Sequence, residues 1–150
     1  MNPGPSRKGI LLVGAVLAVA ATLSALLAPD APSVAEVARA ALGPAAQAAP
    51  EGSDELPGFE AVGVRSDTVA GRGARTVIYR RGATDIHVSI VDGRPLELPG
   101  SDRVTVGDLD LALDRDGDVN LVAWHADGRT RILASRDASA EEMVDLIRRA

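Results

Sequence analysis

Residues 119–134, VNLVAWHADGRTRILA, contain two short apolar segments separated by Asp127 and Gly128. An Asp-Gly dipeptide favours the positive φ angles that a tight β-hairpin requires. We therefore expect an antiparallel hairpin with strands at residues 119–125 and 129–134.

Similar segments recur upstream, each bounded by turn residues such as Gly71, Gly82 and the Asp116-Gly117 pair. They cover residues 59–67, 75–80, 85–91 and, around Gly107, 103–106 and 109–113. We expect about six strands in a small, mainly antiparallel sheet, with a loop at residues 94–102 because Pro95, Pro99 and Gly100 interrupt the pattern there.

The chain ends in a segment with helical periodicity. Ser139 and Glu142 have the spacing of a capping box, and Met143, Val144, Leu146 and Ile147 fall on one side of the helix that follows. This C-terminal helix should cover one face of the sheet, which makes the fold α+β. Alternation places Trp124 on the same strand face as Val122 and opposite Leu121 and Ala123, so Leu146 or Ile147 is expected to pack on the indole.

A different pattern occupies residues 9–28, GILLVGAVLAVAATLSALLA, which carry no charge from Gly9 to Ala28. Twenty such residues form a helix of about 30 Å, the thickness of the hydrocarbon core of a bilayer. Arg7 and Lys8 precede this stretch, so we expect a single-pass anchor in the inner or cytoplasmic membrane with the N-terminus in the cytoplasm and the C-terminal domain outside. The alternative is a cleaved signal and a secreted protein, although the apolar run is longer than a signal usually has.

Between the anchor and the sheet, a short helix and a linker are expected. Ser33 and Glu36 form a second capping box, and Gly43-Pro44 ends the helix. Residues 45–57 are rich in Ala, Pro, Gly and acidic side chains, which favours a linker. The expected organisation is a cytoplasmic stub (1–8), a transmembrane anchor (9–28), a juxtamembrane helix and linker (29–57), and an extracytoplasmic α+β domain (58–150).

Composition excludes several functions. The chain has no cysteine, which removes disulfides, thiolate catalysis and thiolate zinc sites. The part beyond residue 28 holds all 21 acidic but only 14 of the 16 basic residues, a net charge of −7, so nucleic acid is not an expected partner. With one Phe, one Tyr and one Trp, the core must rely on aliphatic side chains.

Two polar patterns imitate functional sites. Asp85, His87 and Ser89 alternate on one strand face, but side chains two residues apart stand parallel and about 6.6 Å from one another, so a solvated polar face is expected rather than a triad. The acidic segment 114–120 resembles a calcium loop. With Gly117 at the sixth loop position, however, the twelfth position is Ala123, so a hairpin turn is expected instead. We expect no catalytic residue, no metal and no cofactor, and His125 is interpreted as a side chain at the end of a strand.

The order of several short motifs resembles a known family. Gly58-Phe59, Val62 to Arg65, Tyr79 to Gly82, the strand around Trp124 and the Glu141-Glu142 helix are similar in order and spacing to the extracytoplasmic domain of bacterial membrane-anchored anti-sigma factors. The resemblance covers residues 58–150. It implies the outer, signal-side half of such a regulator, without its cytoplasmic sigma-binding domain, because only eight residues precede the anchor.

The resemblance implies a membrane-anchored envelope sensor or regulatory module that binds a partner protein or a small signal without catalysis. The partner could be an envelope protein or a separately encoded anti-sigma or sigma component. The positions that match the family pattern, and so could contact a partner, are Arg65, Tyr79, Arg80, Arg81 and Trp124. The alternative is a freestanding envelope module with a structural or carrier role and no part in sigma regulation.

Overall fold

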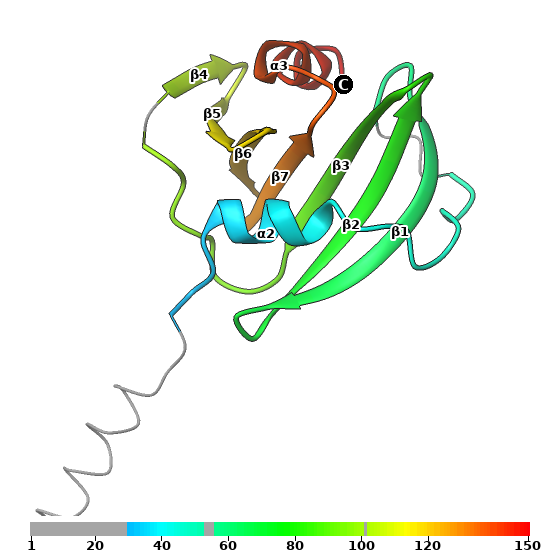
Figure 1. Cartoon of the computed structure of the whole chain (residues 1–150). Coiled ribbons are helices and arrows are strands. Elements are labelled where there is room, and N and C mark those ends of the chain that lie inside the picture. Colours follow the sequence, from blue (N-terminus) through cyan, green and yellow to red (C-terminus); the bar gives the residue numbers. More distant parts are fainter. Residues whose placement is uncertain (1–29, 53–55, 101) are drawn as a thin grey trace, which may run out of the picture. The chain divides into compact units, whose positions relative to one another are not determined.

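One antiparallel sheet of seven strands dominates the computed structural model, which describes residues 30–52, 56–100 and 102–150 (Figure 1). The strands are β1 (Glu60–Val69), β2 (Arg72–Arg81), β3 (Thr84–Val91), β4 (Asp102–Val106), β5 (Leu109–Asp116), β6 (Val119–Ala126) and β7 (Arg129–Ser135). Their order is β1-β2-β3-β7-β6-β5-β4, so two meanders meet where β3 pairs with β7. The mainly antiparallel sheet is confirmed.

The number of strands differs from the expected six. Residues on either side of Gly107 form two separate strands, β4 and β5, joined by a turn in which Gly107 has a φ of 57°. The hairpin between β6 and β7 is confirmed, with φ angles of 53° at Asp127 and 71° at Gly128. The positive φ at both positions is the geometry for which an Asp-Gly pair is suited.

The C-terminal helix α3 (Ala140–Arg149) covers one face of the sheet, as expected. Ser139 and Glu142 form the complete capping box at its start. Met143, Val144 and Leu146 of α3 join a core cluster with Tyr79, Ile86, Leu111, Val122, Leu133 and Trp124. The α3 contacts fall on β4, β5 and β6.

A second core lies on the opposite face, under helix α2 (Val34–Ala41). Three buried residues of α2, Val34, Val37 and Ala38, are packed into a cluster with Leu121, Ala123, Ile132 and Ala134 of β6 and β7, and Ala41 is buried as well. Leu121 and Ala123 thus lie on the face opposite Val122 and Trp124, which confirms the alternation expected for β6. Figure 1 shows α2 crossing the sheet in front of β7 and β3.

The position of α2 extends the folded domain toward the N-terminus. Its capping box, formed by Ser33 and Glu36, is present as expected. The helix nevertheless packs on the sheet, and the compact unit of the chain spans Ala31–Ala150 rather than starting near residue 58. Part of the expected linker is also attached to the sheet, because Gln47 forms an antiparallel bridge with Val64 of β1.

Because α2 covers this face of the sheet, polar residues of β3 on the same face are buried. His87 is 7% exposed and Ser89 is fully buried. The expectation of a solvated polar face was therefore wrong, because α2 and the loop after it exclude solvent from this side of the sheet.

The expected cytoplasmic stub and membrane anchor, residues 1–28, lie outside the described residues. Within residues 30–52, 56–100 and 102–150, no helix has the length and apolar character needed to cross a membrane.

Candidate functional site

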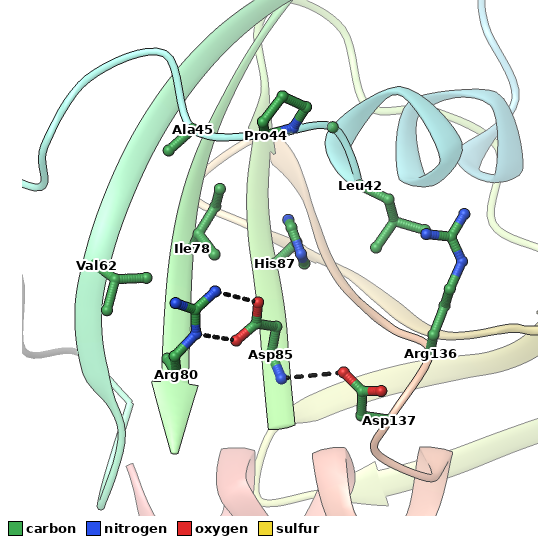
Figure 2. Close-up of a pocket in the computed structure, with 11 residues that line it drawn as sticks. Leu42, Pro44, Ala45, Val62, Ile78, Arg80, Asp85, His87, Arg136 and Asp137 are labelled. Carbon is green, nitrogen blue, oxygen red and sulfur yellow. Dashed lines mark hydrogen bonds and ion pairs between the residues drawn. The ribbon is translucent and has the colours of Figure 1, made fainter. Parts of the chain in front are cut away.

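A pocket of about 400 Å³ opens between the C-terminal end of α2 and the sheet, and we call it the His87 pocket (Figure 2). The loop after α2 forms one wall, β1 to β3 form the floor, and the segment between β7 and α3 forms the other wall. The lining residues are Leu42, Gly43, Pro44, Ala45, Val62, Ile78, Arg80, Asp85, His87, Arg136 and Asp137. A volume of this size is in the range of small-molecule sites.

The loop wall is held by close packing and by Arg65. A Cβ atom at Gly63 would lie 2.3 Å from the Cβ of Ala45, so the loop approaches β1 as closely as a glycine permits. The Arg65 guanidinium donates to the backbone oxygen of Pro44 at 3.2 Å and binds both carboxylate oxygens of Asp67, at 2.7 and 2.5 Å. Arg65 is thus engaged in fixing the loop.

An ion pair lies at one end of the pocket. Nε and Nη2 of Arg80 each donate to a carboxylate oxygen of Asp85 at 2.7 Å, as Figure 2 shows. These hydrogen bonds hold the pKa of the Asp85 carboxyl below its ordinary value. The backbone nitrogen of Asp85 donates to Oδ2 of Asp137 at 3.2 Å, which connects β3 to the segment before α3.

His87 lies on the floor of the pocket and has an unusual hydrogen-bonding state. Its Nδ1 is buried and has no hydrogen-bond partner among the described residues. Burial lowers the pKa of the imidazole below its ordinary value, while a hydrogen bond to the backbone of Ala41 opposes this shift. The ring is therefore neutral at pH 7, and its buried Nδ1 has no hydrogen-bond partner among the described residues.

The charges around His87 come from three elements. Asp85 on the same strand raises its pKa, whereas Arg65 of β1 and Arg136 of the segment after β7 lower it. Arg136 uses Nε to pair with Asp118 at 3.0 Å, a contact exposed to solvent. The pocket thus combines two arginines, two carboxylates and one neutral histidine.

Among the described residues, Ser89 does not join His87 at the pocket. Ser89 Oγ, the third member of the triad-like pattern, lies 2.8 Å from Oγ1 of Thr76 in a buried hydroxyl pair, and Ser89 is not among the residues that line the pocket. The described residues show no hydrogen bond between Ser89 and His87, the contact that would activate a serine. The pocket therefore contains hydrogen-bond donors, acceptors and apolar side chains, but its described residues show no serine–histidine hydrogen bond.

The five positions named from the family pattern do not form one surface. Arg65 and Arg80 face α2, near the His87 pocket. On the other face, Tyr79 is 1% exposed inside the core and the Arg81 guanidinium lies 4.3 Å from the centroid of the Phe59 ring. Trp124, 7% exposed, lies on that face too and lines an apolar pocket of about 320 Å³ together with Leu56, Tyr79, Val88, Leu109 and Ile147.

In the sequence, His87 stands out only as part of the triad-like pattern Asp85, His87 and Ser89, and no motif marks Arg136 or Asp137. The missing signal was the apolar stripe of the 34–41 helix, since a helix with such a stripe must bury it against something. Had that helix been placed on the sheet, the face of His87 would have been recognised as covered.

No family model, curated protein or solved structure was found to match this chain.

Proposed function

We propose that the chain is a membrane-anchored envelope module that receives a small signal in the His87 pocket and binds it without chemical conversion. The observation that carries the proposal is the buried Nδ1 of His87, a residue that lines the pocket, because this atom has no hydrogen-bond partner among the described residues. A buried polar atom left in this state costs about 1–3 kcal/mol, so its presence in a pocket is explained by a ligand that satisfies it.

The place of the pocket in the chain supports a sensory role. Its wall is the loop that follows α2, and α2 itself follows the segment expected to be the anchor. A ligand in the pocket would contact the backbone that leads from the envelope domain toward the membrane segment. This connection and the resemblance to the outer half of anti-sigma factors together favour regulation over the alternative of a structural or carrier module.

The binding part of the proposal is tested with pools of small metabolites and the full chain in detergent micelles. At least one pool should raise the thermal unfolding midpoint of the wild-type chain but not that of His87→Leu, because ligand that binds only the native state stabilises it. If no pool stabilises the wild type, or if every stabilising pool acts equally on His87→Leu, the pocket does not receive a small signal.

The anchor is tested separately with reporter fusions. A reporter that is active only outside the cytoplasm should be active when fused after Ala150 and inactive when fused after Lys8. The reverse pattern would mean that the domain faces the cytoplasm, and the envelope role would be abandoned. A neighbouring gene for a sigma factor would favour the regulatory role, whereas its absence would favour a structural or carrier module.

A further inference from the structure

The ligand class follows from the groups that the His87 pocket presents. His87 is the first. Nδ1 has no partner among the described residues and the Ala41 backbone favours the protonated ring, so we assign the contact with Ala41 to Nε2. A backbone oxygen accepts, so Nε2 carries the hydrogen and the neutral ring presents Nδ1 as an acceptor. A ligand must therefore bring an N–H or O–H group to His87.

Asp137 adds a second acceptor to the same pocket. Its Oδ2 receives the backbone N–H of Asp85, and the described residues place no basic side chain in an ion pair with this carboxylate. Asp85, by contrast, is compensated by the bidentate contact with Arg80. The negative charge of Asp137 and the acceptor on His87 together favour a positively charged donor, such as an ammonium group.

Arg136 supplies the complementary group. Among the described residues, Arg136 pairs through Nε with Asp118, whose side chain is 75% exposed. Exposed pairs of this kind contribute little stability, so Arg136 can exchange this partner for a ligand at small cost. In Figure 2 its side chain extends from the segment after β7 in the direction of Leu42. A guanidinium in this position is suited to a carboxylate.

The rest of the wall is apolar. Leu42, Pro44, Ala45, Val62 and Ile78 line the pocket between its charged groups. A ligand with a short aliphatic part would bury it here, which contributes binding free energy in proportion to the apolar area removed from water. The lining has as many carboxylates as guanidinium groups, so a dianion such as inorganic phosphate would meet Asp85 and Asp137 as well as the two arginines.

We propose that the His87 pocket binds a small zwitterion with an aliphatic side chain, of the class of the free α-amino acids, with its ammonium group toward His87 and Asp137 and its carboxylate toward Arg136. This inference rests on the proposed function, since it names the chemical class of the small signal.

The test uses the full chain in detergent micelles and three probes of similar shape, measured by titration calorimetry. L-Leucine has both charged groups, 4-methylpentanoate lacks the ammonium group, and 3-methylbutylamine lacks the carboxylate. We expect leucine to bind, and each of the other probes to bind at least about tenfold more weakly, because each loses one charged contact.

Two variants that keep His87 assign the contacts. Arg136→Gln should weaken the binding of leucine and leave the weak binding of 3-methylbutylamine unchanged. Asp137→Asn should weaken the binding of leucine and leave the weak binding of 4-methylpentanoate unchanged. Arg103→Gln is the matched control, since Arg103 pairs with Asp110 across β4 and β5 and does not line the pocket, and it should bind leucine like the wild type.

The proposal is overturned if leucine does not bind at millimolar concentration or if 4-methylpentanoate binds as tightly as leucine. It is also overturned if Arg103→Gln weakens the binding of leucine as much as Arg136→Gln does. If leucine does not bind but a metabolite pool stabilises the wild type and not His87→Leu, the pocket is a binding site and the zwitterionic ligand is wrong. A failure of both would reject the proposed function itself.

Discussion

Gly63 of β1 lies so close to Ala45 that a Cβ atom at position 63 would stand 2.3 Å from the Cβ of Ala45. The loop that walls the His87 pocket is therefore set by the absence of a side chain on the opposite strand. Real Cβ atoms do not approach one another this closely, so one of the two segments must move if position 63 gains a methyl group.

Gly63→Ala should consequently lower the free energy of unfolding by about 1–3 kcal/mol, the usual cost of overpacking. Thermal or denaturant unfolding of the compact unit, residues 31–150, measures this change. Gly100→Ala is the matched control, because a Cβ at that position has no heavy atom within 4 Å. Equal stability of the Gly63 and Gly100 variants would show that the loop does not rest against β1.

A second prediction concerns the buried hydroxyl pair of Thr76 and Ser89. Ser89→Ala removes one partner and leaves the Thr76 hydroxyl buried without its bond, which should cost about 1–3 kcal/mol. Thr76→Val combined with Ser89→Ala removes both hydroxyls, so the double variant should be more stable than the sum of the single changes predicts. Additive effects in this double-mutant cycle would mean that the two hydroxyls are not coupled.

The stability of the domain should depend on the charge state of His87. Its pKa is lowered in the folded protein, so between the ordinary value of about 6.5 and the folded value the unfolded chain binds the proton more readily. The stabilising contribution is complete above about pH 6.5 and is lost as the pH falls below it. Burial is the largest cause of this lowered pKa; Arg65 and Arg136 lower it further, whereas the Ala41 backbone and Asp85 oppose the shift.

We therefore expect the free energy of unfolding to fall between about pH 7 and pH 5, above the range in which Asp85, whose pKa is also lowered, begins to bind a proton. His87→Leu should show a smaller loss over the same interval. The comparison requires chemical unfolding at several pH values for both proteins. An identical pH dependence in the two would contradict a buried neutral histidine.

Trp124 provides a probe of the opposite core. It is the only tryptophan, it is 7% exposed, and it packs in the cluster that includes Leu146 of α3. Its fluorescence should be blue-shifted in the native unit of residues 31–150 and should move to longer wavelength on unfolding. Trp124→Ala should cost about 3–5 kcal/mol, as truncations of large core side chains do. Native emission at the solvent-exposed wavelength would instead identify Trp124 as a surface residue.

Local rules predicted much of this fold. Asp127-Gly128 marked a hairpin because its turn needs positive φ, and Ser33 and Ser139 marked two helix starts because their side chains satisfy exposed backbone N–H groups. The two apolar segments around Gly107 were also predicted, at residues 103–106 and 109–113, and the structure shows that each is a strand of its own.

The candidate site could not be predicted in the same way, because it depends on long-range packing. The sequence of residues 34–41 does not predict which surface their apolar stripe packs against. The sequence of β3 alternates in the same way whether its polar face is exposed to solvent or covered. His87 becomes a buried acceptor only when α2, β3 and the segment with Arg136 come together. The charged groups of the pocket lie 39 or more residues along the sequence from Ala41, whose backbone interacts with the ring.

The most direct measurement is a ¹⁵N NMR spectrum of the histidine side chains in the full chain in micelles, with and without L-leucine. At neutral pH we expect His87 to be the neutral tautomer with hydrogen on Nε2 and its Nδ1 resonance to be that of an unprotonated acceptor. We expect leucine to move this resonance upfield by donating a hydrogen bond to Nδ1. A His87 ring with hydrogen on Nδ1, or an Nδ1 resonance that saturating leucine leaves in place, would contradict these expectations.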